Sequence, residues 1–267
     1  MTTKEKLLWA AIVVVLGGVG FLTYQYLQKP QEAAPTAQKN EPPPSTTEPA
    51  APAVENPIPS GASDAGKPLP PLAASDADFA AALTELAGQD TVAALLVRES
   101  IIRNVVVTVD NLPRTKVAVE RRPVKPTPGQ TVVEGDADAG EVATLSVQNY
   151  ARYAPFVKAV QASDVKKLAA LYFRWYPLFQ QAYEDLGYPD KYFNDRLVAA
   201  IDDMLKTPDV EGPIRLVRPK VFFEFADPTL EARSAGQKLL IRMGRENAAG
   251  IKAKLRELRA EIAGHAH

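Results

Sequence analysis

Residues 165–186 read VKKLAALYFRWYPLFQQAYEDL. Large apolar side chains recur in this stretch at steps of three, four and seven residues, and this period places them on one face of an α-helix. Other rings between these positions make the helix apolar over much of its circumference, so we expect it to lie at the centre of a domain. Pro177 is expected to kink the helix or to start a new one, and Gly187 to end it. The face comprises Val165, Leu168, Tyr172, Trp175, Phe179 and Leu186.

Aromatic residues are concentrated around this helix. Residues 150–193 hold 12 of the 16 aromatic residues that follow residue 71. Because each aromatic side chain buries a large area, the region forms either a major part of the core or a binding surface.

Apolar spacing and the capping patterns that start at Ser75 and Ser234 predict further helices, and short runs bounded by Pro and Gly predict strands. The β-branched run 105–107 leaves a strand open as an alternative within the second helix. The helices are expected at 75–87, 92–109, 190–206, 234–243 and 245–263, and the strands at 131–134, 141–146, 214–217 and 221–225. The sequence therefore predicts a mainly α-helical domain with a few short strands.

The N-terminal stretch predicts a membrane anchor. Residues 7–27 contain no charged side chain and, at about 1.5 Å per helical residue, are long enough to cross a hydrocarbon core of roughly 30 Å. Lys4 and Lys6 precede the stretch, and this positive charge places residues 1–6 in the cytoplasm. The remainder of the chain is then expected outside the membrane. A cleaved signal peptide ending near residues 18–20 is the alternative, but apolar residues continue beyond that point.

A proline-rich linker is expected after the anchor. Residues 30–71 hold 12 of the chain's 23 prolines, and no aromatic residue occurs between Tyr26 and Phe79. Such a segment buries too little apolar surface to offset the entropy of ordering it, so we expect residues 28–71 to be a disordered spacer. Residues 72–267 are expected to form the globular domain.

Composition excludes several kinds of site. The chain has no Cys, and its two His lie at positions 265 and 267, which argues against disulfides, thiolate metal sites and catalysis by an internal imidazole. The acidic loop at 135–140 lacks the bidentate Glu that a calcium loop requires. No glycine-rich phosphate loop is present. We therefore expect no metal and no cofactor, and the net charge of −1 argues against nucleic-acid binding.

Two segments of the domain carry opposite charge. Residues 184–209 contain seven acidic and three basic side chains, whereas residues 231–261 contain eight basic and four acidic ones. Either these segments neutralise each other within the fold, or each binds a partner of opposite charge.

Two stretches carry a resemblance to a known family. They read YFRWYPLFQQAYEDLGYPDKYFNDRLVAAIDDMLKTP at 172–208 and FADPTLEARSAGQKLLIRMGRENAAGIKAKLREL at 225–258, with weaker likeness at 110–112 and 150–153. They resemble an uncharacterised bacterial family of membrane-anchored proteins, domain of unknown function 3014. The resemblance implies a location: a single span in the inner membrane of a Gram-negative bacterium, a proline-rich tether and a periplasmic domain. It implies no activity and no site residues.

Three hypotheses for the function follow. The first is a non-enzymatic envelope protein whose domain binds a protein or cell-wall partner. The second is a hydrolase or transferase acting on an envelope substrate, in which carboxylates beside tyrosines would supply acid–base groups. Its catalytic candidates are Asp185, Asp195 and Asp202, with Glu184, Asp190, Tyr188 and Tyr192 nearby; Asp195 and Asp202 share one helical face.

The third hypothesis is binding of anionic lipid or nucleic acid by the basic C-terminal helix. A helix that presents many basic side chains on its surface attracts phosphate groups. The residues concerned are Arg242, Arg245, Lys252, Lys254, Arg256 and Arg259.

Overall fold

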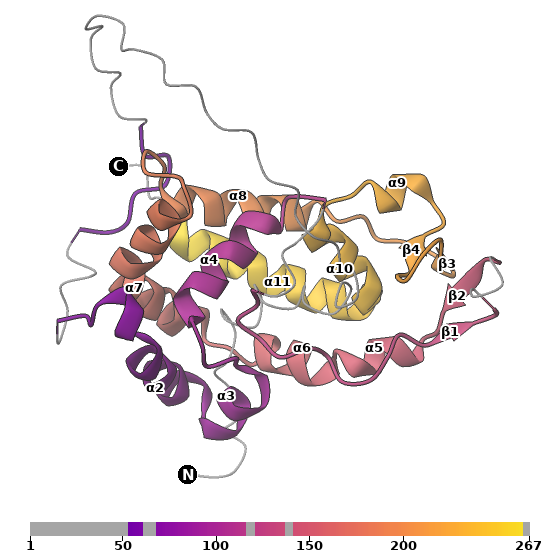
Figure 1. Cartoon of the computed structure of the whole chain (residues 1–267), viewed down its shortest axis with the longest axis horizontal. Coiled ribbons are helices and arrows are strands. Elements are labelled where there is room, and N and C mark those ends of the chain that lie inside the picture. Colours follow the sequence, from indigo (N-terminus) through magenta and orange to yellow (C-terminus); the bar gives the residue numbers. More distant parts are fainter. Residues whose placement is uncertain (1–52, 61–67, 116–120, 137–140, 264–267) are drawn as a thin grey trace, which may run out of the picture.

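A computed structural model describes residues 53–60, 68–115, 121–136 and 141–263 (Figure 1). These residues form a mainly helical globular domain with a small antiparallel sheet, which confirms the predicted fold class. The predicted span at 7–27, the centre of the acidic loop and both histidines lie outside the described residues. Within the described ranges, no helix combines the length and the apolar character needed to cross a membrane.

The predicted central helix is α7 (Val165–Asp185). The Asp164 side chain caps its first turn by accepting hydrogen bonds from the backbone N–H groups of Lys166 and Lys167, both at 3.1 Å. The predicted apolar face is buried up to Phe179, whereas Leu186 is 39% exposed just beyond the helix. The helix is continuous through Pro177, so the alternative of a new helix starting there is wrong.

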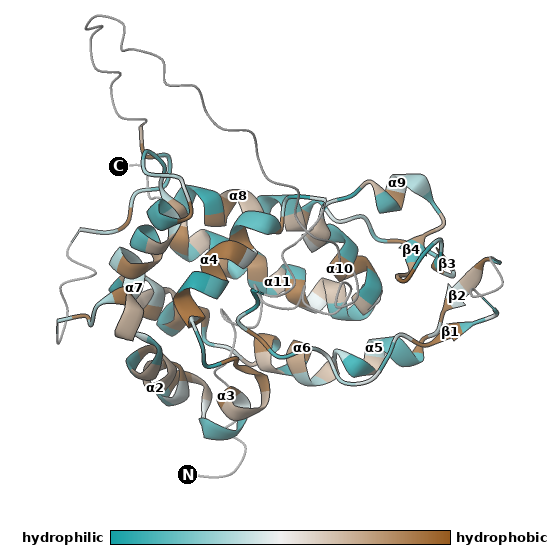
Figure 2. Cartoon of the chain, viewed as in Figure 1, coloured by the Kyte–Doolittle hydropathy of each residue, from teal (hydrophilic) through white to brown (hydrophobic). Residues whose placement is uncertain are grey.

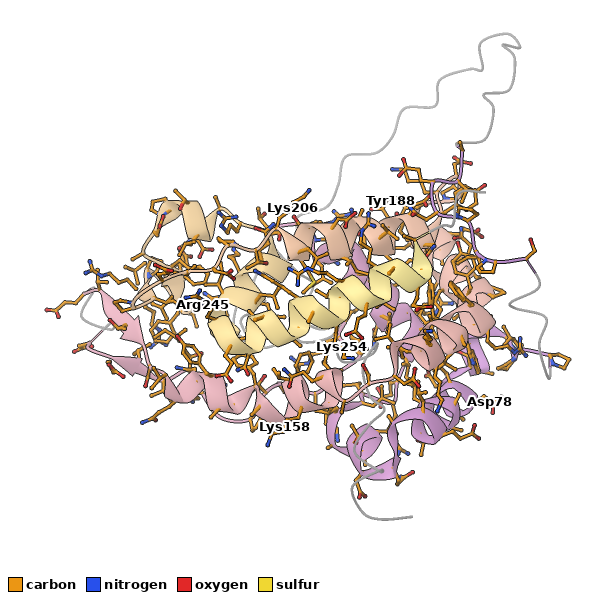
Figure 3. All side chains as sticks on the ribbon, turned by 180° about the vertical axis from the view of Figure 1, so that it is seen from behind. Asp78, Lys158, Tyr188, Lys206, Arg245 and Lys254 are labelled. Atoms are coloured by element: carbon orange, nitrogen blue, oxygen red, sulfur yellow. The ribbon has the colours of Figure 1, made fainter. Side chains whose placement is uncertain are left out.

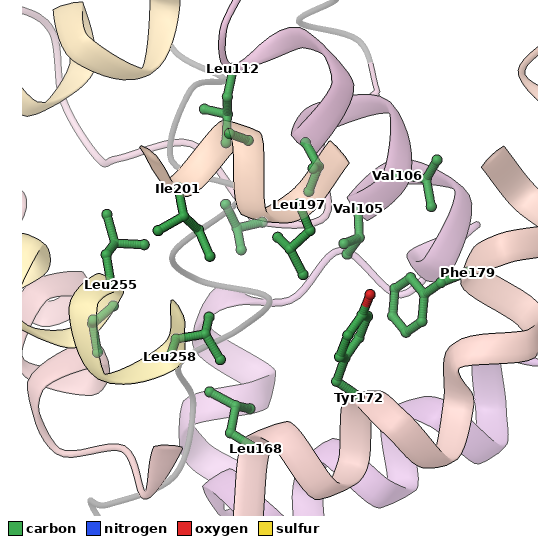
Figure 4. Packing of buried hydrophobic residues seen from close by; sticks show 14 of the residues in the cluster. Val105, Val106, Leu112, Leu168, Tyr172, Phe179, Leu197, Ile201, Leu255 and Leu258 are labelled. Carbon is green, nitrogen blue, oxygen red and sulfur yellow. The ribbon is translucent and has the colours of Figure 1, made fainter. Parts of the chain in front are cut away.

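Four other helices surround α7: α2 (Asp76–Ala87), α4 (Ile101–Asn111), α8 (Phe193–Leu205) and α11 (Arg245–Ile262). Helix α4 packs against α7 and α8, and α11 packs against the same two helices from another side. Figure 2 shows apolar and polar residues alternating along α4 and α8, as expected for amphipathic helices. Figure 4 shows their apolar side chains meeting in one interior, with Tyr172 and Phe179 of α7 beside Val105 of α4.

The aromatic residues of the central region form the core. Phe79 of α2 meets Trp175 and Phe179 with ring centroids 5.0 and 5.7 Å apart, both edge to face. Phe179 also stacks on Phe193 of α8 at 5.7 Å. Such pairs stabilise beyond the area that they bury. Six of the twelve rings in residues 150–193 are buried, so the region forms a major part of the core.

The expected helix at 92–109 is two helices, α3 (Gln89–Leu95) and α4. The first residue of α2, Asp76, fixes where α4 begins. The Asp76 carboxylate accepts hydrogen bonds from the backbone N–H groups of Ser100 (2.7 Å) and Ile101 (2.8 Å), and so caps α4. The Ser75 side chain does not cap α2 as predicted, because its hydroxyl donates to the Leu72 carbonyl. The β-branched run in α4 is helical because its valines are buried on several sides.

Four short strands form a sheet at the end of the domain far from α7 (Figure 1): β1 (Val133–Glu134), β2 (Ala143–Leu145), β3 (Arg215–Val217) and β4 (Glu224–Phe225). They pair in sequence order, all antiparallel, with Leu145 opposite Val133 and Leu216 opposite both Ala143 and Phe225. A strand lies within each of the four predicted segments, but each is shorter than predicted, at two or three residues.

Helix α10 (Ala235–Met243) follows the sheet and packs against α8 and α11. Its predicted N-cap is confirmed, because Ser234 Oγ accepts from the Gln237 N–H at 3.2 Å. Gly244, at φ +84°, ends the helix, and the predicted apolar stripe of α11 is buried. The remaining elements are a 3-10 turn (Leu72–Ala74), α5 (Gln148–Arg152), α6 (Ala154–Gln161) and α9 (Pro228–Glu231).

Candidate functional site

A cavity of about 440 Å³ opens where the end of α4, the loop between α7 and α8, and the first turns of α8 meet. Tyr188, labelled in Figure 3, lies at this edge of the domain. The volume falls within the range of small-molecule sites in proteins. The polar residues of its lining are Glu55, Asp110, Arg114, Tyr183, Tyr188, Asp190, Lys191, Tyr192, Asp195 and Arg196.

A charged cluster of Asp110, Arg114 and Arg196 forms part of the cavity wall. The side chain of Asp110 is only 8% exposed, and its two oxygens accept from Arg196 Nε at 3.0 Å and from Arg114 Nη2 at 2.7 Å. The main-chain carbonyl of Asp110 accepts from Arg114 Nε at 3.2 Å and from Arg196 Nη2. One carboxylate therefore faces two guanidinium groups, and its charge raises the pKa of Arg114.

The local fold explains this cluster. Asp110 lies in the last turn of α4, and Arg114 follows just beyond the end of the helix, close enough along the chain for the two side chains to meet. Arg196 lies in the first turn of α8, which packs against α4. Two packed helices thus bring charges together from positions 86 residues apart.

Tyrosines extend the wall of the cavity. The Tyr188 hydroxyl accepts a hydrogen bond from Arg114 Nη2 at 2.8 Å, and its ring stacks on Tyr183 with centroids 4.7 Å apart. Lys191 Nζ lies 5.5 Å from the centroid of the Tyr188 ring, within cation–π range. These contacts fix the orientation of the Tyr188 hydroxyl in the cavity.

Residues 53–60, which we call the N-terminal strap, lie against the start of α8. Asp195 Oδ1 accepts from Asn56 N at 2.7 Å and from Asn56 Nδ2 at 3.1 Å, and Oδ2 accepts from Glu55 N at 3.3 Å. Ile58 packs against the core. The strap belongs to the folded part of the chain, although its composition assigned it to the linker at 28–71. Its Glu55 lines the cavity.

Asn194 lies beside this site but forms a different kind of network. It is fully buried, and its Oδ1 accepts from the Tyr172 hydroxyl at 3.1 Å. Its Nδ2 donates to the carbonyls of Asn56 and Ile262, each at 2.9 Å. One amide thus joins the strap, α7 and the end of α11. Burial raises the pKa of Tyr172 well above its ordinary value.

The three predicted catalytic carboxylates do not form one site. Asp185 pairs with Arg103 at 2.8 Å, and Asp202 makes a bidentate pair with Arg259, at 2.5 Å to Nε and 3.0 Å to Nη2. Asp195 lines the cavity, where it holds the strap. The shared helical face of Asp195 and Asp202 therefore serves two separate contacts. Of the nearby candidates, Asp190, Tyr188 and Tyr192 line the cavity, and Glu184 accepts from Gln180 Nε2 at 2.9 Å.

Most basic side chains of the C-terminal segment bond to other residues of the domain. Besides the Arg259–Asp202 pair, Lys252 Nζ donates to the Thr207 carbonyl at 2.7 Å and to Asp209 at 3.0 Å, which lowers the pKa of Asp209. Arg245 lies 3.7 Å from Glu211. These contacts support mutual neutralisation of the two charged segments rather than a free basic face.

Two other basic side chains of this segment are also bonded. Arg242 is buried against the Phe225 ring, at 4.5 Å from its centroid, and donates to the Phe223 carbonyl at 2.7 Å. Burial lowers its pKa. Lys254 donates to Glu257 at 2.7 Å.

Sequence reasoning missed the charged cluster and the strap. Asp110 itself was a usable signal. It follows the apolar positions Val105, Val106 and Val109 in one helix, and an acidic side chain beside such a buried face is unusual. Arg196 and the strap gave no such signal.

Within the described ranges, no group of three or more His, Cys, Asp or Glu residues is arranged to hold a metal ion.

Comparison with known proteins assigns the chain to a family. No curated protein and no solved structure matches it. A family model described as protein of unknown function (DUF3014) matches residues 101–259, from the first residue of α4 into the last turn of α11, and this range includes the whole charged cluster. Because the match covers more than half of the chain, the chain belongs to this family.

Proposed function

We propose that the chain is a single-span protein of the bacterial inner membrane whose periplasmic domain binds a protein or cell-wall partner through the cavity beside Tyr188. The uncharged stretch 7–27, preceded by Lys4 and Lys6, supports the anchor and its orientation. The strap shortens the spacer to residues 28–52, which reach at most about 80 Å if they adopt the extended conformation of proline-rich chains. The domain then works within this distance of the membrane.

One observation carries the proposal of binding: the cavity holds a charged cluster whose donors are only partly used. An arginine has five N–H donors. The bonds of Arg114 and Arg196 involve Nε and Nη2 of each, so both Nη1 groups are without a partner among the described residues. Fixed side chains with donors left over suit recognition of a partner, because the partner meets an arrangement that needs no reordering.

The same contacts argue against Asp110 and Asp195 as catalytic acids or bases. Both oxygens of Asp110 are bonded to guanidinium groups, and the oxygens of Asp195 are bonded to donors of the strap. A catalytic acid or base needs an oxygen within reach of the substrate proton. These carboxylates use their oxygens to hold the protein together.

The location is tested by cysteine labelling, which the cysteine-free chain permits without background. Val147→Cys puts a thiol at a site that is 70% exposed, and Thr3→Cys puts one before the proposed span. In spheroplasts, a membrane-impermeant maleimide should label residue 147 and not residue 3, and lysis should expose both. Labelling of residue 3 alone before lysis would contradict the orientation.

Partner binding is tested by native co-purification of the full chain with Lys191→Glu and the matched control Lys166→Glu. Both lysines are exposed, but Lys166 does not line the cavity. We expect partners recovered with the wild type to be lost only with Lys191→Glu. Identical partners for both variants, or none for the wild type under several mild conditions, would count against the proposal.

A further inference from the structure

We propose that the cavity takes a small ligand carrying both a carboxylate and an ammonium group, as at the ends of an amino acid or a short peptide. The carboxylate would bind Arg114, Arg196 and Tyr188, and the ammonium would lie beside Glu55 and Asp190. The inference rests on the proposed function because it names the chemical group of the partner that enters the cavity.

The charged cluster carries excess positive charge. Asp110 neutralises one of the two guanidinium groups, and its oxygens are already bonded to both. The remaining positive charge is available to an acceptor from outside the chain, as are the Nη1 donors of Arg114 and Arg196, which bond to no other described residue. Two guanidinium groups side by side match a carboxylate, whose two oxygens accept parallel hydrogen bonds.

Tyr188 adds a neutral donor at the same place. Its hydroxyl oxygen accepts from Arg114 at 2.8 Å, so the hydroxyl hydrogen is available to an anion. Stacking on Tyr183 holds the ring in this position. Lys191, beside the same ring, adds a third positive charge to the lining.

Two exposed acidic side chains, Glu55 and Asp190, line the same cavity. Asp195 does not add to this pair, since the strap donors occupy its oxygens. A ligand whose carboxylate binds the charged cluster therefore shares the cavity with two carboxylates, which attract a positive charge at its other end. A simple anion such as phosphate gains nothing from Glu55 and Asp190.

The test is calorimetric titration of the full chain, purified in detergent micelles, with matched probes. Alanyl-alanine carries both groups, its C-terminal amide lacks the carboxylate, and its N-acetyl form lacks the ammonium. Removing one charge-assisted contact weakens binding by about tenfold or more. We therefore expect alanyl-alanine to bind at least about tenfold more tightly than the amide, and also more tightly than the N-acetyl form and inorganic phosphate. Free alanine separates an amino acid from a peptide end as the natural source.

Variants locate the binding. Tyr188→Phe keeps the stacked ring and removes the hydroxyl, and we expect about tenfold weaker binding of alanyl-alanine. Glu55→Gln combined with Asp190→Asn should abolish the preference over the N-acetyl form. Arg103→Gln, whose exposed ion pair with Asp185 lies outside the lining, is the control and should bind as the wild type does. Thermal unfolding of each variant shows that its fold is intact.

The outcomes separate this inference from the proposed function. Equal binding of alanyl-alanine and its amide, tighter binding of phosphate, or wild-type binding by Tyr188→Phe would overturn the ligand class. Loss of partners with Lys191→Glu would still support the proposed function in that case. Conversely, a cytoplasmic domain that binds alanyl-alanine selectively would overturn the proposed location and leave the ligand class standing.

Discussion

Two polar networks lie at neighbouring positions of α8 and differ in how completely they are bonded. Asn194 is fully buried, and each of its polar atoms is bonded within the chain, to Tyr172, Asn56 and Ile262. Arg196, two residues later, joins Asp110 in a cluster that borders a cavity and keeps unused donors. We call these the closed network and the open cluster.

Stability and recognition depend on different networks in this domain. A buried polar group that is fully bonded fixes the relative positions of its partners, and losing it strands them. A cluster with spare donors at a cavity contributes less to stability than its charges suggest, because its guanidinium groups reach solvent. Its unused bonds are available to a ligand. The predictions below change one network at a time.

The largest loss of stability is expected from Asn194→Ala. The substitution strands the Tyr172 hydroxyl and two carbonyl groups, so we expect the free energy of unfolding to fall by about 3 kcal/mol. Urea unfolding followed by circular dichroism measures this. A loss below about 1 kcal/mol would show that the closed network does not hold the strap, α7 and α11 together.

A smaller loss is expected from Asp110→Ala. It removes two charge-assisted hydrogen bonds, but Arg114 and Arg196 are partly exposed and can be solvated, so we expect about 2 kcal/mol. Ligand binding should also fail, because the guanidinium groups lose their fixed orientation. The same unfolding measurement and the alanyl-alanine titration check both effects. A loss of stability larger than that of Asn194→Ala would reverse the comparison.

Alkaline pH should weaken the closed network. Burial raises the pKa of Tyr172, and it raises that of Tyr176 to about 12. The folded protein therefore keeps protons that the unfolded chain releases, so this stability is present below pH about 10 and is lost as the pH rises toward 12. Tyr172→Phe should cost about 1 kcal/mol at neutral pH and flatten this fall. Unfolding midpoints measured from pH 8 to 11.5 would contradict the account if the two proteins lost stability equally.

The smallest effect is expected from Asp202→Asn. The Arg259 pair is bidentate but about 40% exposed on both sides, and exposed ion pairs contribute about 0.5 kcal/mol. Neither ligand binding nor partner recovery should change, because Asp202 does not line the cavity. Loss of a cellular phenotype at unchanged stability would instead support the carboxylate hydrolase hypothesis.

Local periodicity predicted most of the helices, including α7, α8 and α11, because their apolar faces are continuous in sequence. It failed at residues 96–100, where the chain leaves one helix and Asp76, from an earlier helix, caps the next one. No local pattern contains that contact.

The candidate site was predicted only in part. Asp195 and three of its neighbours do line the cavity, but Asp195 binds a strap 139 residues away instead of a substrate. The Asp110–Arg196 pair likewise joins two helices that are remote in sequence. Such pairs depend on how the helices pack. The strap was assigned to the linker because its composition resembles that of the linker.

In-cell photo-crosslinking of the full chain tests whether the open cluster binds a partner outside the inner membrane. A benzophenone amino acid replaces Lys191 at the cavity or, as the matched control, Lys166 on α7. We expect periplasmic or cell-wall products, identified by mass spectrometry, from position 191 and not from position 166. Identical products from both positions, or cytoplasmic proteins alone from position 191, would contradict it.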